Sequence, residues 1–119
     1  MMMRPLLVLL ALLGSCALAA AHAMLDRASP AVGSTVASPP RSITLSFTEN
    51  IEPAFSTVRV EDASGARVDQ GKPQLDRGSR NVLRVNLKAL GPGTYKVIWK
   101  VLSVDTHRTE GSFAFQVGR

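Results

Sequence analysis

The chain has 119 residues, with 14 lysines and arginines against 9 aspartates and glutamates and a formal net charge of +5. This length fits one small domain and excludes a multidomain enzyme. The basic residues are spread along the chain without a block of like charge. They therefore predict a solvated basic surface and no nucleic-acid partner.

The beginning of the chain has the pattern of a secretory signal peptide. Arg4 precedes an apolar run at residues 6–13 that is too short to span a bilayer, and a tract of small residues follows. We therefore expect residues 1–21 to be removed. Residues 22–119 should then form one exported domain that acts outside the cytoplasm.

The position of the cut has alternatives. Cleavage after Ala21 makes His22 the first residue, whereas cleavage after Ala19 leaves two alanines before it. The only cysteine, Cys16, stands in a segment that loosely resembles a lipoprotein cleavage box, which would leave a lipidated terminus. If cleavage occurs after Ala19 or Ala21, the exported domain has no cysteine and cannot form a disulfide. Its apolar core or a bound ligand must then stabilise it.

Two-residue alternation of apolar and polar residues, typical of half-buried β-strands, runs through most of the exported part. The clearest segments are 42–48, 57–61, 83–88, 94–101 and 112–117. Turn-forming prolines, glycines and aspartates separate these segments, and no long stretch has a helical period. The sequence predicts an all-β domain of about seven strands, an antiparallel Greek-key β-barrel or sandwich of immunoglobulin-like shape.

The two histidines of the exported part are candidate metal ligands. As a first residue, His22 would offer its α-amine and an imidazole nitrogen together. Asp105 and His107 follow the strand that carries Trp99, and at strand spacing their side chains should project on the same side. Taken alone, His22 could also be an ordinary polar residue near the terminus, and Asp105 and His107 could form an ordinary hydrogen bond on the surface.

Together the three residues make a set of three nitrogen donors and one oxygen donor. Such a set without a thiolate favours Cu(II), with zinc as the natural competitor. A serine hydrolase site is disfavoured because no serine stands in a recognisable nucleophile elbow, and Ser103 is merely the serine nearest to Asp105.

Several separated motifs resemble the copper-resistance CopC family, in the same order and across essentially the whole exported part. They lie at residues 22–25 (HAML), 29–34 (SPAVGS), 45–49 (LSFTE), 53–56 (PAFS), 92–99 (PGTYKVIW), 103–107 (SVDTH) and 111–115 (GSFAF). The chain departs from the family at Arg108, where a proline usually follows the histidine. With Met24 as the only methionine of the exported part, a methionine-rich Cu(I) site is also absent.

The resemblance implies a periplasmic β-barrel that binds Cu(II) through His22, by amine and imidazole, with Asp105 and His107. It also implies that Glu49 lies beside the site and orients a ligand. The expected function is that of a monomeric chaperone or buffer, not an enzyme. It would serve a membrane copper transporter like CopD.

Two other functions stay open. A copper site at a terminal histidine is also found in oxidative polysaccharide monooxygenases, which use a broad, flat aromatic face. The chain has one tryptophan, one tyrosine and four phenylalanines, and the alternation assigns most of them to the core. An adhesive immunoglobulin-like module with incidental histidines is the third interpretation.

Overall fold

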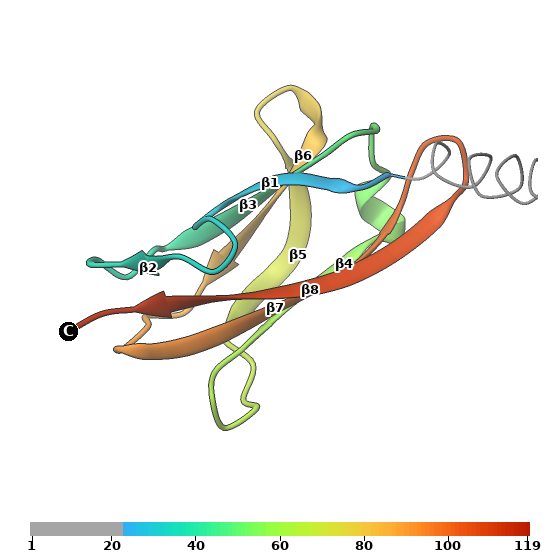
Figure 1. Ribbon diagram of the computed structural model, residues 1–119. Helices are drawn as coiled ribbons and strands as arrows, with labels where there is room; N and C mark the ends of the chain where they lie inside the picture. The colour runs from blue at the N-terminus through green and yellow to red at the C-terminus, as the bar shows by residue number, and fades with distance from the viewer. Residues whose placement is uncertain (1–22) are drawn as a thin grey trace, which may run out of the picture.

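The computed structural model describes residues 23–119, so the predicted signal peptide and His22 lie outside the described residues (Figure 1). The described strands are β1 (Leu25–Ser29), β2 (Thr35–Val36), β3 (Ser42–Phe47), β4 (Thr57–Glu61), β5 (Asp69–Asp76), β6 (Ser79–Leu87), β7 (Gly93–Leu102) and β8 (Arg108–Val117), with a short 3₁₀-helix η1 (Pro53–Phe55) before β4. The prediction of an all-β immunoglobulin-like fold is confirmed, with eight strands where about seven were expected.

The strands form two sheets of four. One has the order β1-β3-β6-β5 and the other the order β2-β8-β7-β4. After β1 the chain crosses to the other sheet, where the two residues of β2 pair with the end of β8 in parallel. All other strand pairs are antiparallel, as the alternation predicted.

The core lies between the two sheets and follows the predicted alternation. The inward side chains of β3 and β7 are all buried, and Leu45, Phe47 and Val97 among them are at most 1% exposed. Phe47 of one sheet meets the Trp99 ring of the other edge-on, with ring centroids 5.2 Å apart and an interplanar angle of 73°. This contact joins the sheets, and such edge-to-face pairs stabilise beyond their buried area.

The longest hairpin of the described chain consists of β7 and β8, which pair from Gly93 with Val117 to Leu102 with Arg108. Gly111 lies opposite Trp99, and a Cβ atom added there would be only 2.6 Å from the indole ring. A glycine is therefore needed at this position for the tryptophan ring to lie this close to β8. The packed hairpin carries the turn that connects the two strands.

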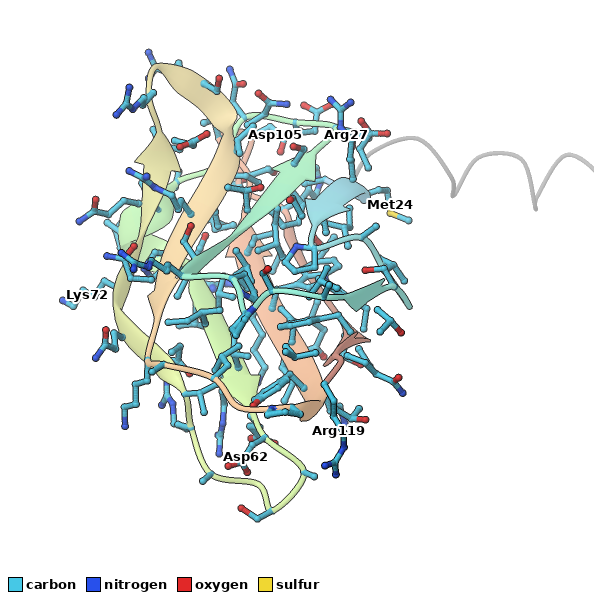
Figure 2. All side chains as sticks on the ribbon, turned by 90° about the vertical axis from the view of Figure 1, so that its left-hand side faces the viewer. Met24, Arg27, Asp62, Lys72, Asp105 and Arg119 are labelled. Atoms are coloured by element: carbon cyan, nitrogen blue, oxygen red, sulfur yellow. The ribbon has the colours of Figure 1, made fainter. Side chains whose placement is uncertain are left out.

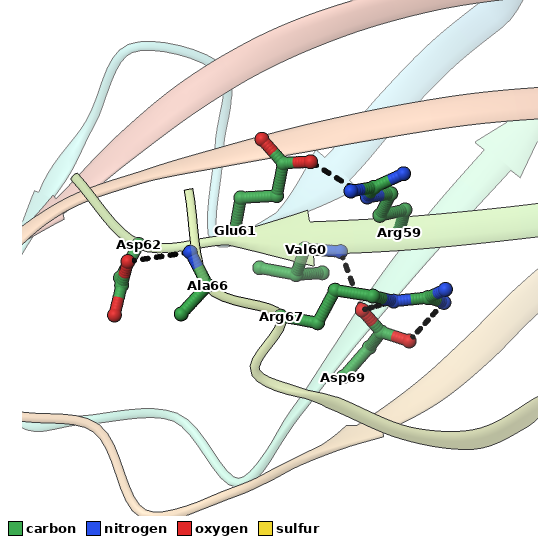
Figure 3. A network of polar contacts seen from close by, with 7 residues as sticks. All are labelled: Arg59, Val60, Glu61, Asp62, Ala66, Arg67 and Asp69. Carbon is green, nitrogen blue, oxygen red and sulfur yellow. Dashed lines mark hydrogen bonds and ion pairs between the residues drawn. The ribbon is translucent and has the colours of Figure 1, made fainter. Parts of the chain in front are cut away.

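A polar network closes the side where β4 and β5 approach each other (Figure 3). The carboxylate of Asp69, 4% exposed, accepts hydrogen bonds from the Val60 amide at 2.9 Å and from Arg67 Nη2 at 2.8 Å. Burial acts to raise the pKa of Asp69, but the hydrogen bonds from Arg67 and Val60 outweigh it and hold that pKa below its usual value.

Three segments far apart in the sequence gather at one end of the sandwich. They are the residues before β1, the segment between β3 and η1, and the turn between β7 and β8 (Figure 1). Figure 2 shows Met24 and Asp105 at this end, with Asp62 and Arg119 at the opposite end. The predicted site residues within the described chain all belong to these three segments.

Candidate metal centre

The turn between β7 and β8 holds Asp105 and His107. It is closed by the Ser103 amide, which donates to the His107 carbonyl at 3.0 Å, and by the Thr106 amide, which donates to the Ser103 carbonyl at 2.9 Å. Thr106 adopts a φ of 72°, which is uncommon for a β-branched residue. These bonds fix the backbone on both sides of Asp105.

The side chains of this turn form a chain of polar contacts. The buried Ser103 hydroxyl donates to Asp105 Oδ1, and the same carboxylate oxygen lies 3.3 Å from His107 Nδ1. The Ser103 hydrogen bond, helped by His107, outweighs burial and holds the pKa of the Asp105 carboxyl below its usual value. Asp105 is therefore an anion at neutral pH and orients the imidazole beside it.

The prediction that Asp105 and His107 project from one side of a strand is wrong. β7 ends at Leu102 and β8 begins at Arg108, so both residues lie in the turn. The two side chains still meet, because the turn folds His107 back over Ser103 instead of projecting alternate residues to one side. Their side chains remain 48% and 44% exposed, which leaves the pair accessible at the end of the sandwich.

The residues that follow His22 lie beside this turn. The Ala23 carbonyl accepts a hydrogen bond of 2.8 Å from the hydroxyl of Thr109, two residues after His107. The side chain of Ala23 is fully buried in the core. The backbone at the start of the described chain is thus fixed against β8.

Glu49 lies in the exposed segment that follows β3, between two residues that contact the other parts of this end. Thr48 exchanges backbone and side-chain hydrogen bonds with Met24. The Asn50 carbonyl accepts a hydrogen bond of 3.0 Å from the Val104 amide. Glu49 therefore stands between the start of β1 and the turn that holds the histidine.

Of the predicted site residues, the structure brings Asp105 and His107 into contact and places Glu49 at the same end. His22 lies outside the described residues. Within residues 23–119 no three histidine, cysteine, aspartate or glutamate side chains gather as a metal site. The predicted metal centre is therefore represented in the described chain by one pair of donor residues.

Two hydroxyl groups at this end, those of Ser103 and Thr109, were not predicted as functional from the sequence. Ser103 continues the inward series of residues 95, 97, 99 and 101, so it is a polar residue at a position where the alternation requires burial. That mismatch was a signal for a hydrogen-bonding role. Thr109 gives no comparable signal, because its partner Ala23 lies 86 positions away.

Comparison with known proteins shows the same fold and similar sequences. Protein YobA of Escherichia coli K12 is 36% identical over 98 residues, covering 82% of this chain and 79% of that protein. Copper transport protein CutJ of Bacillus subtilis is 30% identical over 100 residues, covering 83% of this chain and 18% of that much longer protein.

Solved structures agree with the sequence matches. CopC from Methylosinus trichosporium OB3b has a TM-score of 0.76 at 32% identity, covering 82% of this chain and 94% of that one. PcoC, described as a methionine-rich copper resistance protein from Escherichia coli, has a TM-score of 0.70 at 31% identity, covering 82% and 99%.

The fold and the exposed carboxylate–imidazole pair define a small all-β domain of immunoglobulin-like shape with a polar site at one end. The CopC domain family matches residues 25–118. The chain therefore belongs to the CopC family, whose members include copper resistance proteins. In the described part, residues 23–119, no helix is long and apolar enough to cross a membrane.

Proposed function

We propose that the chain is exported to the periplasm and binds one Cu(II) ion through His22, Asp105 and His107. It acts in copper resistance as a monomeric chaperone or buffer and not as an enzyme. The observation that carries this proposal is the hydrogen bond from Thr109 to Ala23. Thr109 is two residues after His107 and Ala23 directly follows His22, so the bond joins the neighbourhoods of the two histidines in the sequence. Consecutive Cα atoms are about 3.8 Å apart, so the Cα atom of His22 must lie within that distance of the Cα atom of Ala23.

The chemistry of the donor set supports copper. Cleavage after Ala21 frees the amine of His22, so that the terminal residue and His107 supply three nitrogens and Asp105 supplies an oxygen. His107 Nδ1 and Asp105 Oδ1 are 3.3 Å apart. Two adjacent ligand atoms, each about 2.1 Å from one ion, are separated by roughly 3 Å, so the pair fits one metal. Nitrogen and oxygen ligands in a tetragonal arrangement suit Cu(II).

Glu49 is proposed to orient the terminal residue and not to bind the ion itself. It is exposed and directly follows Thr48, which holds Met24. A carboxylate beside a ligand fixes its orientation and raises its basicity. Glu49 is thus close in sequence to Thr48, which holds Met24, two residues after His22.

The exposure of the site supports storage and transfer. The Asp105 and His107 side chains are 48% and 44% exposed, so a partner can approach the ion directly. In CutJ, a copper transport protein, the matching domain makes up only 18% of the chain. We propose that the present chain meets a membrane copper transporter similar to CopD.

The alternative of an oxidative enzyme lacks the surface that it requires. Tyr95, Trp99, Phe47 and Phe115 are at most 7% exposed and belong to the core. Within the described chain, Phe55 is the aromatic residue that stands out, at 63% exposure. This distribution favours a binding protein over an enzyme that grips a polysaccharide on a flat aromatic face. A peroxide-dependent oxidation assay should give no product.

The decisive experiment begins with the intact mass of the exported protein, which locates the cut. Chains beginning at His22 and at Ala20 are then titrated with Cu(II) and Zn(II) in competition with a chelator. For the first chain we expect one Cu(II), preferred over Zn(II), with an electron paramagnetic resonance spectrum of tetragonal nitrogen and oxygen ligation. His107→Ala and Asp105→Ala should weaken binding, while the control Glu110→Ala, another exposed carboxylate near the turn, should not.

For the chain that begins at Ala20 we expect the opposite result, namely that His107→Ala and Asp105→Ala leave copper binding unchanged. This chain would bind Cu(II) through its amine, two backbone amides and the imidazole of a third-position histidine, without Asp105 or His107. An exported protein that begins at Ala20 and binds copper regardless of His107→Ala would overturn the proposed site. A preference for Zn(II), or no bound metal, would overturn the proposed function.

A further inference from the structure

Two threonine hydroxyls bind the first described residues, one from β8 and one from the residue directly after β3 of the other sheet. Thr109, on β8, donates its hydroxyl hydrogen to the Ala23 carbonyl at 2.8 Å. The Met24 amide donates to the hydroxyl oxygen of Thr48 at 2.9 Å, and the Thr48 amide donates to the Met24 carbonyl at 2.9 Å. We call Thr48 and Thr109 the threonine clamp.

The clamp acts where regular strand pairing has ended. The paired residues of β1 and β3 begin at Leu25 with Phe47, and the register shifts directly after Leu25. Beyond that pair, the Ala23 and Met24 backbone is held by the two threonines and by the burial of the Ala23 methyl group. Both ends of the peptide unit between Ala23 and Met24 are therefore anchored, one to each sheet.

We propose that Thr48 and Thr109 are positioning residues of the metal centre, an inference that rests on the proposed function. They fix the direction in which the chain leaves the sandwich toward His22. Because Thr109 lies two residues after His107, its bond fixes Ala23, the residue next to His22 in the sequence, beside the turn. A chelating residue attached to an ordered backbone loses less conformational entropy when it binds a metal than one on a disordered backbone.

A purely structural role is the competing explanation. In that case the hydroxyls only satisfy the backbone hydrogen bonds before β1, and their removal lowers the stability of the fold without changing the copper ligands. The two roles differ in what they change. Positioning alters the affinity for Cu(II) and the symmetry of its ligand field, whereas sealing alters the melting temperature of the metal-free chain.

The test uses the exported chain that begins at His22, with Thr109→Val and Thr48→Val, which remove the hydroxyl and keep the shape. Competition with a Cu(II) chelator should show about 10- to 100-fold weaker binding for each variant, the range found when residues supporting a metal ligand are replaced. The electron paramagnetic resonance parameters should shift. Thr109→Ser should restore both, and Thr94→Val, an exposed threonine at the other end of β7, should change neither.

The outcomes separate the clamp from the proposed function. If Thr109→Val and Thr48→Val bind Cu(II) like the wild type while His107→Ala loses binding, the clamp is refuted and the site stands. A lower melting temperature with an unchanged spectrum and affinity likewise refutes positioning. If His107→Ala binds normally, the proposed site fails and the clamp fails with it.

Discussion

Replacing Gly111 by alanine should destabilise the fold through a single steric contact. The added Cβ would lie 2.6 Å from Trp99 Cζ2 and 2.9 Å from Cε2, whereas ordinary van der Waals contact begins at 3.4 Å. The indole must therefore move away from β8. Its retreat is opposed by Phe47, whose ring packs edge-on against Trp99 at a centroid distance of 5.2 Å.

The expected cost follows from two opposing effects. Overpacking of a well-packed core costs about 1–3 kcal/mol. Replacing glycine by alanine recovers about 0.4–1 kcal/mol, because the unfolded chain loses conformational freedom. The midpoints of these two ranges leave the Gly111→Ala chain about 1.3 kcal/mol less stable, and each kcal/mol lowers the melting temperature of a domain of this size by about 4–8 °C.

Thermal unfolding followed by circular dichroism measures this loss. The emission of Trp99, the only tryptophan, reports the displacement of the ring itself. Gly118→Ala is the matched control, because its new Cβ would find its nearest neighbours at 3.7 Å. Equal melting temperatures and identical emission for Gly111→Ala and the wild type would refute the steric reasoning.

Three further predictions concern charge and metal. Asp69→Asn should lower stability at neutral pH. The folded-state pKa of Asp69 lies below the ordinary value of about 3.9, so the wild-type advantage is present above that pH and is lost as the pH falls through the lowered pKa. Urea unfolding from pH 7 to pH 3 should show the two curves converging, and a constant difference would contradict this. Cu(II) at about 100-fold excess over its dissociation constant should stabilise the His22 chain by about 2.7 kcal/mol. An unchanged melting temperature would argue against the named ligands. Because Met24 is the only methionine after residue 21, Cu(I) should bind weakly and pass to a moderate chelator on reduction. Its retention would reveal a soft site.

The central strands were predictable because they alternate cleanly. In β3 and β7 every second side chain is apolar and buried, which the sequence alone indicates. The edge strand β4 alternates as well, whereas β1 and β5, at the two edges of the other sheet, carry no such pattern. β5 contains Gly71 and Pro73, which are poor strand formers, and it is tolerated because it lies at the edge of its sheet.

The contact between Asp105 and His107 was predictable from the sequence, whereas the turn that holds them was not. Asp105 and His107 are two positions apart, so their proximity follows from almost any local conformation, strand or turn. The hydroxyl contacts of Ser103 depend on a specific five-residue turn. The bond from Thr109 to Ala23 depends on how two sheets are stacked, which no local pattern encodes.

That same bond indicates that the end of the sandwich with Asp105 and His107 is completed late in folding. It joins positions 86 apart, and contacts with large sequence separation require the intervening chain to be arranged before they gain anything. The anchor for the terminal residue is therefore completed only when both sheets are assembled. An unfolded chain therefore has no preformed site for the proposed metal. Loading with copper would thus report that the domain has finished folding.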